Sequence, residues 1–183
     1  MQMNRCLKFL VINGPNLNLL GKLRPEDGIT LASIEEGLNS RRRELEAKHD
    51  VVIVLHFRQS NNEGDLISWV GDAPGNFDGI VINPSTYAST SFSLAIAVRA
   101  VCDRVPAVEV HLSPASARSE PLQHSLLADA CLDLIEGRNA NSYDALVYGT
   151  ALEYLLKHVL EEQEKSRQHK AETTIAFPKV RAG

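Results

Sequence analysis

Short apolar runs that alternate with segments of helical periodicity are the feature that most limits how this chain can fold. Five runs rich in valine and isoleucine have the length and composition of buried strands, at residues 7–12, 51–57, 79–82, 107–112 and 132–135. Helical patterns lie between or after them, at residues 30–49, 63–71, 92–102 and 142–163. Parallel neighbours need crossover connections of this kind. The pattern predicts an α/β fold in which helices cover both faces of a five-stranded parallel sheet, with strand order 2-1-3-4-5.

The length of the chain and the change in its composition near the end suggest how it is divided. A chain of 183 residues with 44% hydrophobic content can bury one good core and is too short for two comfortable domains. From about Lys165 the sequence turns polar, and it then ends in a small apolar patch at residues 175–178. We therefore expect one domain at residues 1–164 and an extended C-terminal arm at 165–183, which could dock on a neighbouring subunit.

Charge and motif content argue against several classes of partner. The net charge of -4 offers no surplus to neutralise phosphates, and the basic residues 41–43 are followed at once by Glu44 and Glu46, so we expect no nucleic-acid partner. The apolar run at residues 9–12 is too short for a membrane span or a signal-peptide core, so we expect no membrane partner. The glycine-rich loops that hold dinucleotides or nucleotide phosphates are missing, which makes a dinucleotide enzyme an unfavourable hypothesis.

The cysteines point to a reducing compartment. Cys6, Cys102 and Cys131 lie far apart within apolar stretches, which is neither a disulfide framework nor the spacing of metal ligands. We expect buried, reduced thiols in a cytoplasmic protein.

Ligands bind beyond the carboxyl ends of the strands in a parallel α/β sheet, and those positions are unusually polar here. The first three predicted strands lead into polar segments at residues 13–18, 59–63 and 83–91. Structural explanations also exist, because Asn-Gly-Pro-Asn favours a tight turn and Ser91 is a plausible helix N-cap. Capping explains one hydroxyl of the serine and threonine series and not the whole series.

The fourth predicted strand carries polar side chains within itself. Period-two alternation places Glu109, His111 and Ser113 on one face and the intervening apolar residues on the other. A carboxylate two residues before a histidine on the same face can hold the imidazole in one tautomer and favour its protonated form, as a general acid requires. A purely structural Glu–His hydrogen bond explains the same pattern, so the sequence leaves both interpretations open.

Taken together, these segments resemble the type II dehydroquinases. The matching blocks follow the family's order and spacing, at residues 13–21, 59–64, 82–84, 109–113 and 117–118. The resemblance extends over roughly residues 7–160. It implies a flavodoxin-like three-layer sandwich, no metal or cofactor, and trimers that assemble into a dodecamer.

The family's reaction is loss of water from 3-dehydroquinate through an enolate. A tyrosine on a lid loop removes the proton, and a histidine protonates the departing hydroxyl. By resemblance, Asn16 holds the water that stabilises the enolate, His111 is the general acid, and Glu109 orients it.

The resemblance also indicates where a small cyclic carboxylate would bind. Asn83 and the backbone of Leu112 and Ser113 correspond to the groups around the substrate carboxylate. Arg118 corresponds to the arginine near the lid and the base, and Ser89 stands in the place of a substrate-binding histidine.

The other half of the family's site departs from the pattern. The lid loop at residues 22–28 is one residue shorter, Leu23 falls where an arginine belongs, and no tyrosine precedes Gly28. Ile96 replaces an aspartate that reaches a neighbouring subunit's site, and Leu122 replaces an arginine that grips the substrate hydroxyls.

These substitutions predict weak or absent dehydration of dehydroquinate. Loss of a positioned general base typically lowers the rate by about 10²–10⁴-fold. Two residues could compensate. Arg24 lies one position from the expected arginine on the lid, and Tyr87 could act as a base, although family members commonly carry tyrosine there without that role.

Two functions therefore compete. The first is a dehydratase of this family, slow on dehydroquinate or adapted to a related cyclic acid. The second is a non-catalytic member that binds a carboxylate metabolite or serves as an assembly or regulatory subunit. A third, an FMN carrier, is set aside because residues 14–17 supply no hydroxyl-rich phosphate loop.

Overall fold

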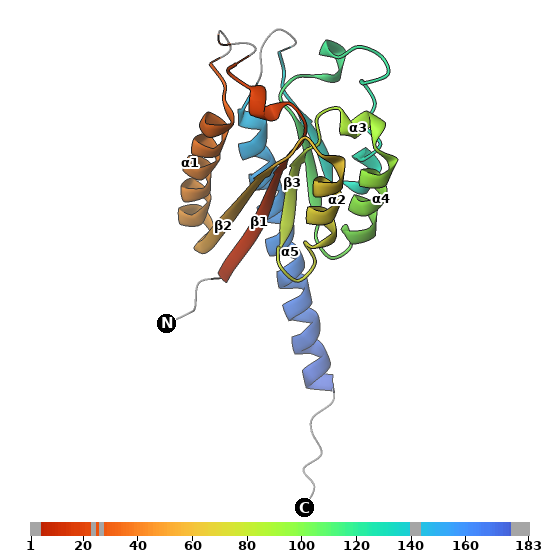
Figure 1. Cartoon of the computed structure of the whole chain (residues 1–183). Helices are drawn as coiled ribbons and strands as arrows, with labels where there is room; N and C mark the ends of the chain where they lie inside the picture. The colour runs from red at the N-terminus through yellow and green to blue at the C-terminus, as the bar shows by residue number, and fades with distance from the viewer. Residues whose placement is uncertain (1–4, 23–24, 26–27, 140–143, 177–183) are drawn as a thin grey trace, which may run out of the picture.

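A parallel sheet forms the centre of the molecule. The computed structural model describes residues 5–22, 25, 28–139 and 144–176, with the backbone alone for 171–176. The five strands are β1 (Arg5–Asn13), β2 (Val51–Gln59), β3 (Gly79–Asn83), β4 (Ala107–His111) and β5 (Asp133–Glu136). Their order is β2-β1-β3-β4-β5, and every neighbouring pair is parallel (Figure 1). The flavodoxin-like α/β fold and the 2-1-3-4-5 order predicted from the sequence are confirmed.

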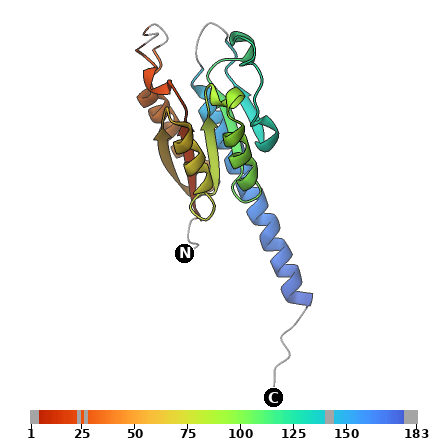
Figure 2. The same cartoon turned by 45° about the vertical axis from the view of Figure 1, so that its right-hand side comes forward.

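Helices cover both faces of this sheet. The α-helices are α1 (Leu31–His49), α2 (Glu63–Gly71), α3 (Tyr87–Thr90), α4 (Phe92–Val101) and α5 (Leu146–Ala176). Helices α1 and α5 pack on one face, and α2 and α4 pack on the other (Figures 1 and 2). Strand β1 serves both layers, because Phe9 and Val11 belong to one core and Leu10 and Ile12 to the other. Burial on both faces explains why the central strands are continuous apolar runs.

Local capping fixes where the helices begin. Thr30 is the N-cap of α1, and its side chain and that of Ser33 bond each other's backbone N–H in a capping box. Ser91 caps α4 by accepting a hydrogen bond from the Leu94 N–H at 2.8 Å. Ser91 therefore has the structural role that its position suggested, and it is not available as a ligand-binding hydroxyl.

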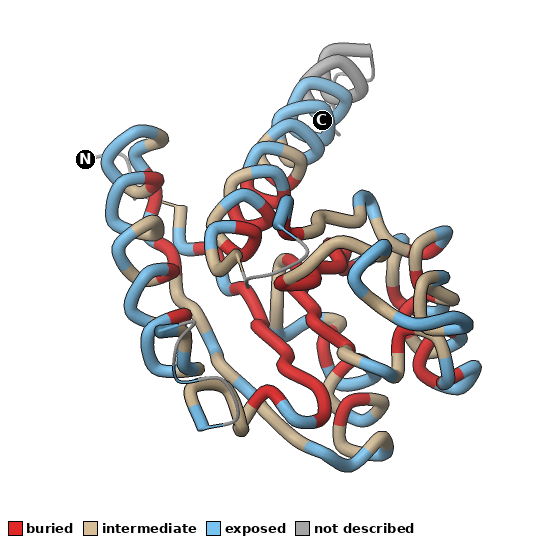
Figure 3. The backbone as a smooth tube through the Cα atoms, turned by 90° about the horizontal axis from the view of Figure 1, so that it is seen from above, coloured by how far each residue is buried: buried red, intermediate tan, exposed pale blue. Residues whose placement is uncertain are grey.

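The expected extended arm is wrong for residues 165–176, which continue α5 as helix. A polar composition is compatible with a helix here, because glutamate, lysine, glutamine and arginine are good helix formers. A Glu162–Lys165 ion pair one turn apart supports this part of the helix. The side chains from residue 161 to 170 are largely exposed, and the far part of α5 lies outside the packed body (Figure 3). Residues 177–183 lie outside the described part of the chain.

The cysteines also depart from expectation. All three are free thiols, but Cys6 is exposed and Cys102 and Cys131 are only partly buried. Cys6 pairs in register with Val52, which is itself 42% exposed, so one face of the sheet is left uncovered where β1 and β2 begin. Burial of the Cys131 thiol raises its pKa. Among the described residues, no helix is both long enough and apolar enough to cross a membrane.

Candidate active site

A cavity of about 230 Å³ opens at the carboxyl edge of the sheet. The described residues that line it are Pro15, Asn16, Leu17, Leu20, Asn83, Ser85, Thr86, His111, Leu112, Ser113, Arg118 and Leu122. They come from the segments that follow β1, β3 and β4. Four of the residues that the sequence singled out, Asn16, Asn83, His111 and Ser113, lie together in this lining.

The two central strands bring the loops above them close together. Asn13 at the end of β1 is in register with Asn83 at the end of β3. The next residue, Gly14, donates its N–H to the Asn83 carbonyl at 2.7 Å, and a Cβ at this position would lie 2.6 Å from the Pro84 carbonyl oxygen. Only glycine fits this approach. Asn16 then adopts a left-handed backbone with φ 67°, and its N–H donates to Asn61 Oδ1 at 3.0 Å.

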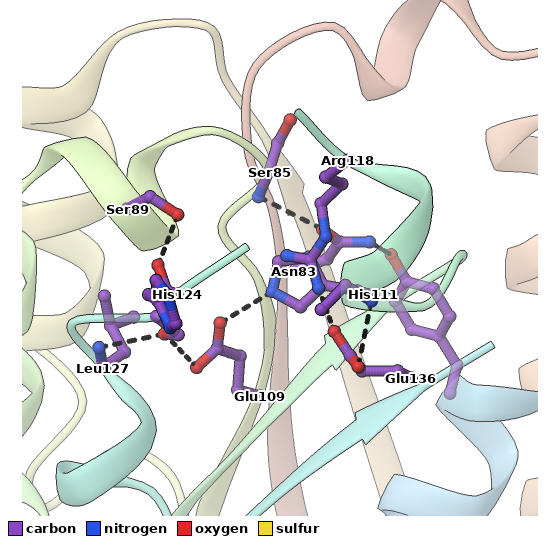
Figure 4. A network of polar contacts seen from close by, with 12 residues as sticks. Asn83, Ser85, Ser89, Glu109, His111, Arg118, His124, Leu127 and Glu136 are labelled. Atoms are coloured by element: carbon purple, nitrogen blue, oxygen red, sulfur yellow. Dashed lines mark hydrogen bonds and ion pairs between the residues drawn. The ribbon is translucent and has the colours of Figure 1, made fainter. Parts of the chain in front are cut away.

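The histidine that lines the pocket lies at the end of β4. His111 Nε2 lies 2.7 Å from Glu109 Oε1, and Ser125 donates its hydroxyl to the other carboxylate oxygen, also at 2.7 Å (Figure 4). Glu109 is fully buried and His111 is only 6% exposed. The Leu127 N–H donates to the Ser125 oxygen at 3.0 Å, which fixes that hydroxyl in turn. With Nε2 held by Glu109, Nδ1 is the imidazole nitrogen left for a ligand.

A buried network of hydrogen bonds orients the Asn83 side chain. The Asn83 Nδ2 donates to the Tyr148 hydroxyl at 3.0 Å, and that hydroxyl donates to Asn13 Oδ1 at 2.5 Å. The Asn83 Oδ1 accepts the Ser85 N–H at 3.2 Å (Figure 4). Burial raises the pKa of Tyr148, so its phenol keeps the proton that it donates. The orientation of the Asn83 amide is therefore defined on both of its polar atoms.

The cationic side of the pocket is a single arginine in the described part of the lining. Arg118 forms an ion pair with Glu136, through Nη2 and Oε1, at the end of β5. The other oxygen of Glu136 accepts the Ala115 N–H at 3.1 Å. The Arg118 Nε is buried and has no hydrogen-bond partner among the described residues.

Several predicted residues lie elsewhere. Ser89 is not part of the described lining, because its hydroxyl donates to the His124 carbonyl at 2.5 Å. Tyr87 is likewise outside the lining, and its hydroxyl donates to the Asn61 carbonyl at 2.9 Å, which removes it as a candidate base. Ile96 lies on α4 and is 68% exposed. Arg24 belongs to the lid and lies outside the described residues.

Comparison with known proteins agrees with this geometry. A profile of the family described as "Dehydroquinase class II" matches residues 7–155 of the chain. The chain belongs to the type II dehydroquinase family. Its membership accounts for the fold and for the order in which the polar loops reach the pocket.

Individual relatives cover most of the chain. The 3-dehydroquinate dehydratase of Prochlorococcus marinus (strain NATL1A) is 41% identical over 145 residues, which span 78% of this chain and 94% of the relative. The 3-dehydroquinate dehydratase of Sinorhizobium medicae (strain WSM419) is 43% identical over 137 residues, or 74% and 87% of the two chains. The crystal structure of the type II dehydroquinase from Butyrivibrio crossotus DSM 2876 has a TM-score of 0.70 at 31% identity, covering 81% and 97%.

Three side chains around the site of this dehydroquinase-family chain were not predicted: Ser125, Glu136 and Tyr148. Tyr148 carried a usable signal, because it lies four residues before Leu152 on the apolar stripe of a helix, and a buried tyrosine needs a hydrogen-bond partner. Glu136 is in register with His111 across β4 and β5, but it comes one residue after the predicted strand. Within the described residues, no group of three or more histidine, cysteine, aspartate or glutamate side chains is placed to hold a metal ion.

Proposed function

We propose that this protein is a hydro-lyase of the 3-dehydroquinate dehydratase type, which binds a small cyclic carboxylate and turns it over slowly. One observation carries the proposal: a histidine with a buried carboxylate partner faces a cavity that Asn16 and Asn83 also line. The curated relatives named above are 3-dehydroquinate dehydratases, and the family profile matches residues 7–155, which include every residue of the described cavity lining.

The acid half of the reaction follows from the contacts of His111. Its Nε2 is held by a fully buried carboxylate, which fixes the orientation of the imidazole ring and leaves Nδ1 for a ligand. A proton delivered from Nδ1 to a departing hydroxyl would complete the loss of water. Asn16 would stabilise the enolate through a bound water, while Asn83 and the backbone of Leu112 and Ser113 would surround the carboxylate.

The base half explains the slow turnover. The described lining contains no carboxylate or phenol that could serve as an anionic base. The sequence has no tyrosine before Gly28 and has leucine where the family's lid arginine belongs. The absence of a positioned general base would lower the rate by about 10²–10⁴-fold.

A non-catalytic role is the second candidate, and Leu122 favours it. Leu122 lines the cavity at the place of the arginine that grips substrate hydroxyls in the family. A ligand hydroxyl that lies against the leucine side chain has no hydrogen-bond partner there, which costs about 1–3 kcal/mol of binding free energy. Such a protein would bind a less hydroxylated cyclic carboxylate, or act as an assembly or regulatory subunit, without dehydrating dehydroquinate.

We also propose that the chain self-associates as a trimer or dodecamer. The proposed location is the cytoplasm. Phe92 and Ile96 on α4 are 71% and 68% exposed, which is unusual for large apolar side chains. By resemblance, position 96 faces a neighbouring subunit, so a second copy of the chain is the expected cover for this helix. Light scattering of the purified protein, compared with a Phe92→Ser/Ile96→Ser variant, would measure the assembly.

A direct assay of enone formation from 3-dehydroquinate tests the catalytic proposal. The wild-type chain should produce enone slowly, and an Asn16→Ala/His111→Ala variant should produce none. Equal signal from both proteins would indicate a contaminating enzyme. No signal from either, together with measurable binding of a cyclic carboxylate, would favour the non-catalytic role.

A further inference from the structure

The charge of the pocket's arginine is already compensated inside the protein. Arg118 is the one arginine or lysine in the described lining, and its guanidinium is paired with Glu136 (Figure 4). The side chains of the two partners are 18% and 24% exposed, so water screens their attraction only in part. The second oxygen of Glu136 is held by the Ala115 N–H, which keeps the carboxylate at this place.

Two parts of the cavity lining therefore differ in charge. The Asn83 amide and the backbone of Leu112 and Ser113 are groups without formal charge that could surround an anion. Glu109, the other buried acid nearby, is occupied by His111 and Ser125. At the Arg118 end, an incoming anion would meet the guanidinium and the carboxylate of Glu136 together.

We propose that Glu136 is a specificity-determining residue that makes the Arg118 end of the pocket accept an uncharged oxygen and reject a second carboxylate. A guanidinium whose charge is compensated still has N–H groups that can donate to a hydroxyl or carbonyl oxygen. The ligand class is then a cyclic monocarboxylate with a neutral oxygen across the ring. This inference rests on the proposed function, which places the carboxylate beside Asn83.

A purely structural role for the pair makes a different prediction. Glu136 also ties the turn at Ala115 to β5, so its loss could lower stability without any effect on ligand charge. The selectivity between a monoanion and a dianion separates these two roles, because only an electrostatic role changes the ratio of their affinities.

The experiment is a calorimetric titration at pH 7.5 with two matched probes, cyclohexanecarboxylate and cis-cyclohexane-1,3-dicarboxylate. Wild-type protein should prefer the monocarboxylate. Glu136→Gln should tighten the dicarboxylate on the order of tenfold and change the monocarboxylate by less than threefold, since one opposing charge has been removed at short range. The control is Glu162→Gln, whose side chain is 54% exposed on α5 and should alter neither constant.

A second variant covers the case in which Glu136→Gln does not fold. Arg118→Gln leaves Glu136 without its cation, so both acids should bind more weakly and the dicarboxylate should lose the larger factor. Equal changes for the two acids, or no binding of either acid by any of these proteins, would overturn the proposal. Enone formation is measured separately, so a chain that shows the charge selectivity but no turnover would refute the catalytic function and leave the role of Glu136 standing.

Discussion

Removal of the Tyr148 hydroxyl should destabilise the fold and weaken the hydrogen bonding that orients Asn83 in the pocket. The hydroxyl bridges Asn13 Oδ1 at 2.5 Å and Asn83 Nδ2 at 3.0 Å, and the exposed fractions of the three residues are 1%, 1% and 2% for Tyr148, Asn13 and Asn83. Phenylalanine keeps the ring and its packing. It leaves two buried polar groups without their partner, and each such group costs about 1–3 kcal/mol.

We therefore expect Tyr148→Phe to lower the free energy of unfolding by about 2–6 kcal/mol in total. Urea unfolding followed by circular dichroism is the assay, at fixed protein concentration because self-association adds to apparent stability. With a slope of about 2 kcal/mol per molar urea, the midpoint should fall by about 1–3 M. Binding of cyclohexanecarboxylate should also weaken, since the Asn83 amide then keeps only the Ser85 N–H of the two contacts that orient it.

Tyr154→Phe is the matched control, because Tyr154 lies on the same helix and is 44% exposed. It should change the unfolding free energy by less than 0.5 kcal/mol, as is usual for surface substitutions. If Tyr148→Phe were no more destabilising than this control, the structural role of the hydroxyl between Asn13 and Asn83 would be refuted.

Three further substitutions test other parts of the structure. Ser125→Ala should lower kcat about tenfold with KM unchanged in a steady-state assay, because Glu109 loses a hydrogen bond that fixes it behind His111; a change confined to KM would argue against this. Leu122→Arg should tighten quinate relative to cyclohexanecarboxylate by about tenfold in calorimetry, because a donor then meets the ring hydroxyls; an unchanged ratio would show that other residues bind them. Lys157, Lys48 and Arg41 hold the pKa of Glu153 at about 2, below its ordinary 4.5, so its contribution is complete above pH 4.5 and is lost as the pH falls toward 2. Glu153→Gln should therefore cost about 1 kcal/mol in urea unfolding at pH 7 and almost nothing at pH 2, and a cost independent of pH would contradict the assignment.

The parts of the site that the sequence predicts are those set by backbone periodicity. Glu109 and His111 share a face because side chains in a strand alternate, whatever surrounds the strand. The positions of Asn16 and Asn83 follow from the rule that parallel strands present their carboxyl ends at one edge. Neither inference requires knowledge of how distant segments pack.

The partners of these residues depend on tertiary packing. Tyr148 is 135 residues from Asn13 and 65 from Asn83 in the sequence, and no local pattern brings them together. Glu136 meets Arg118 only because β5 lies beside β4 and the loop after β4 folds back over it. Ser89 has an available carbonyl at His124, so the position that suggested ligand binding is used in packing instead.

The most direct test of the proposal that the site keeps the acid half of the family's machinery and lacks the base half is to supply the missing half. A variant would replace residues 22–27 with a loop one residue longer, which carries arginine at the second position after Gly21 and tyrosine immediately before Gly28. Turnover of 3-dehydroquinate should rise by about 10²–10⁴-fold over the unmodified chain, and the same loop in a His111→Ala background should give no rise. A wild-type chain that already turns over at the rate of the grafted variant, or a graft that gains nothing although His111 is present, would contradict this division of the site.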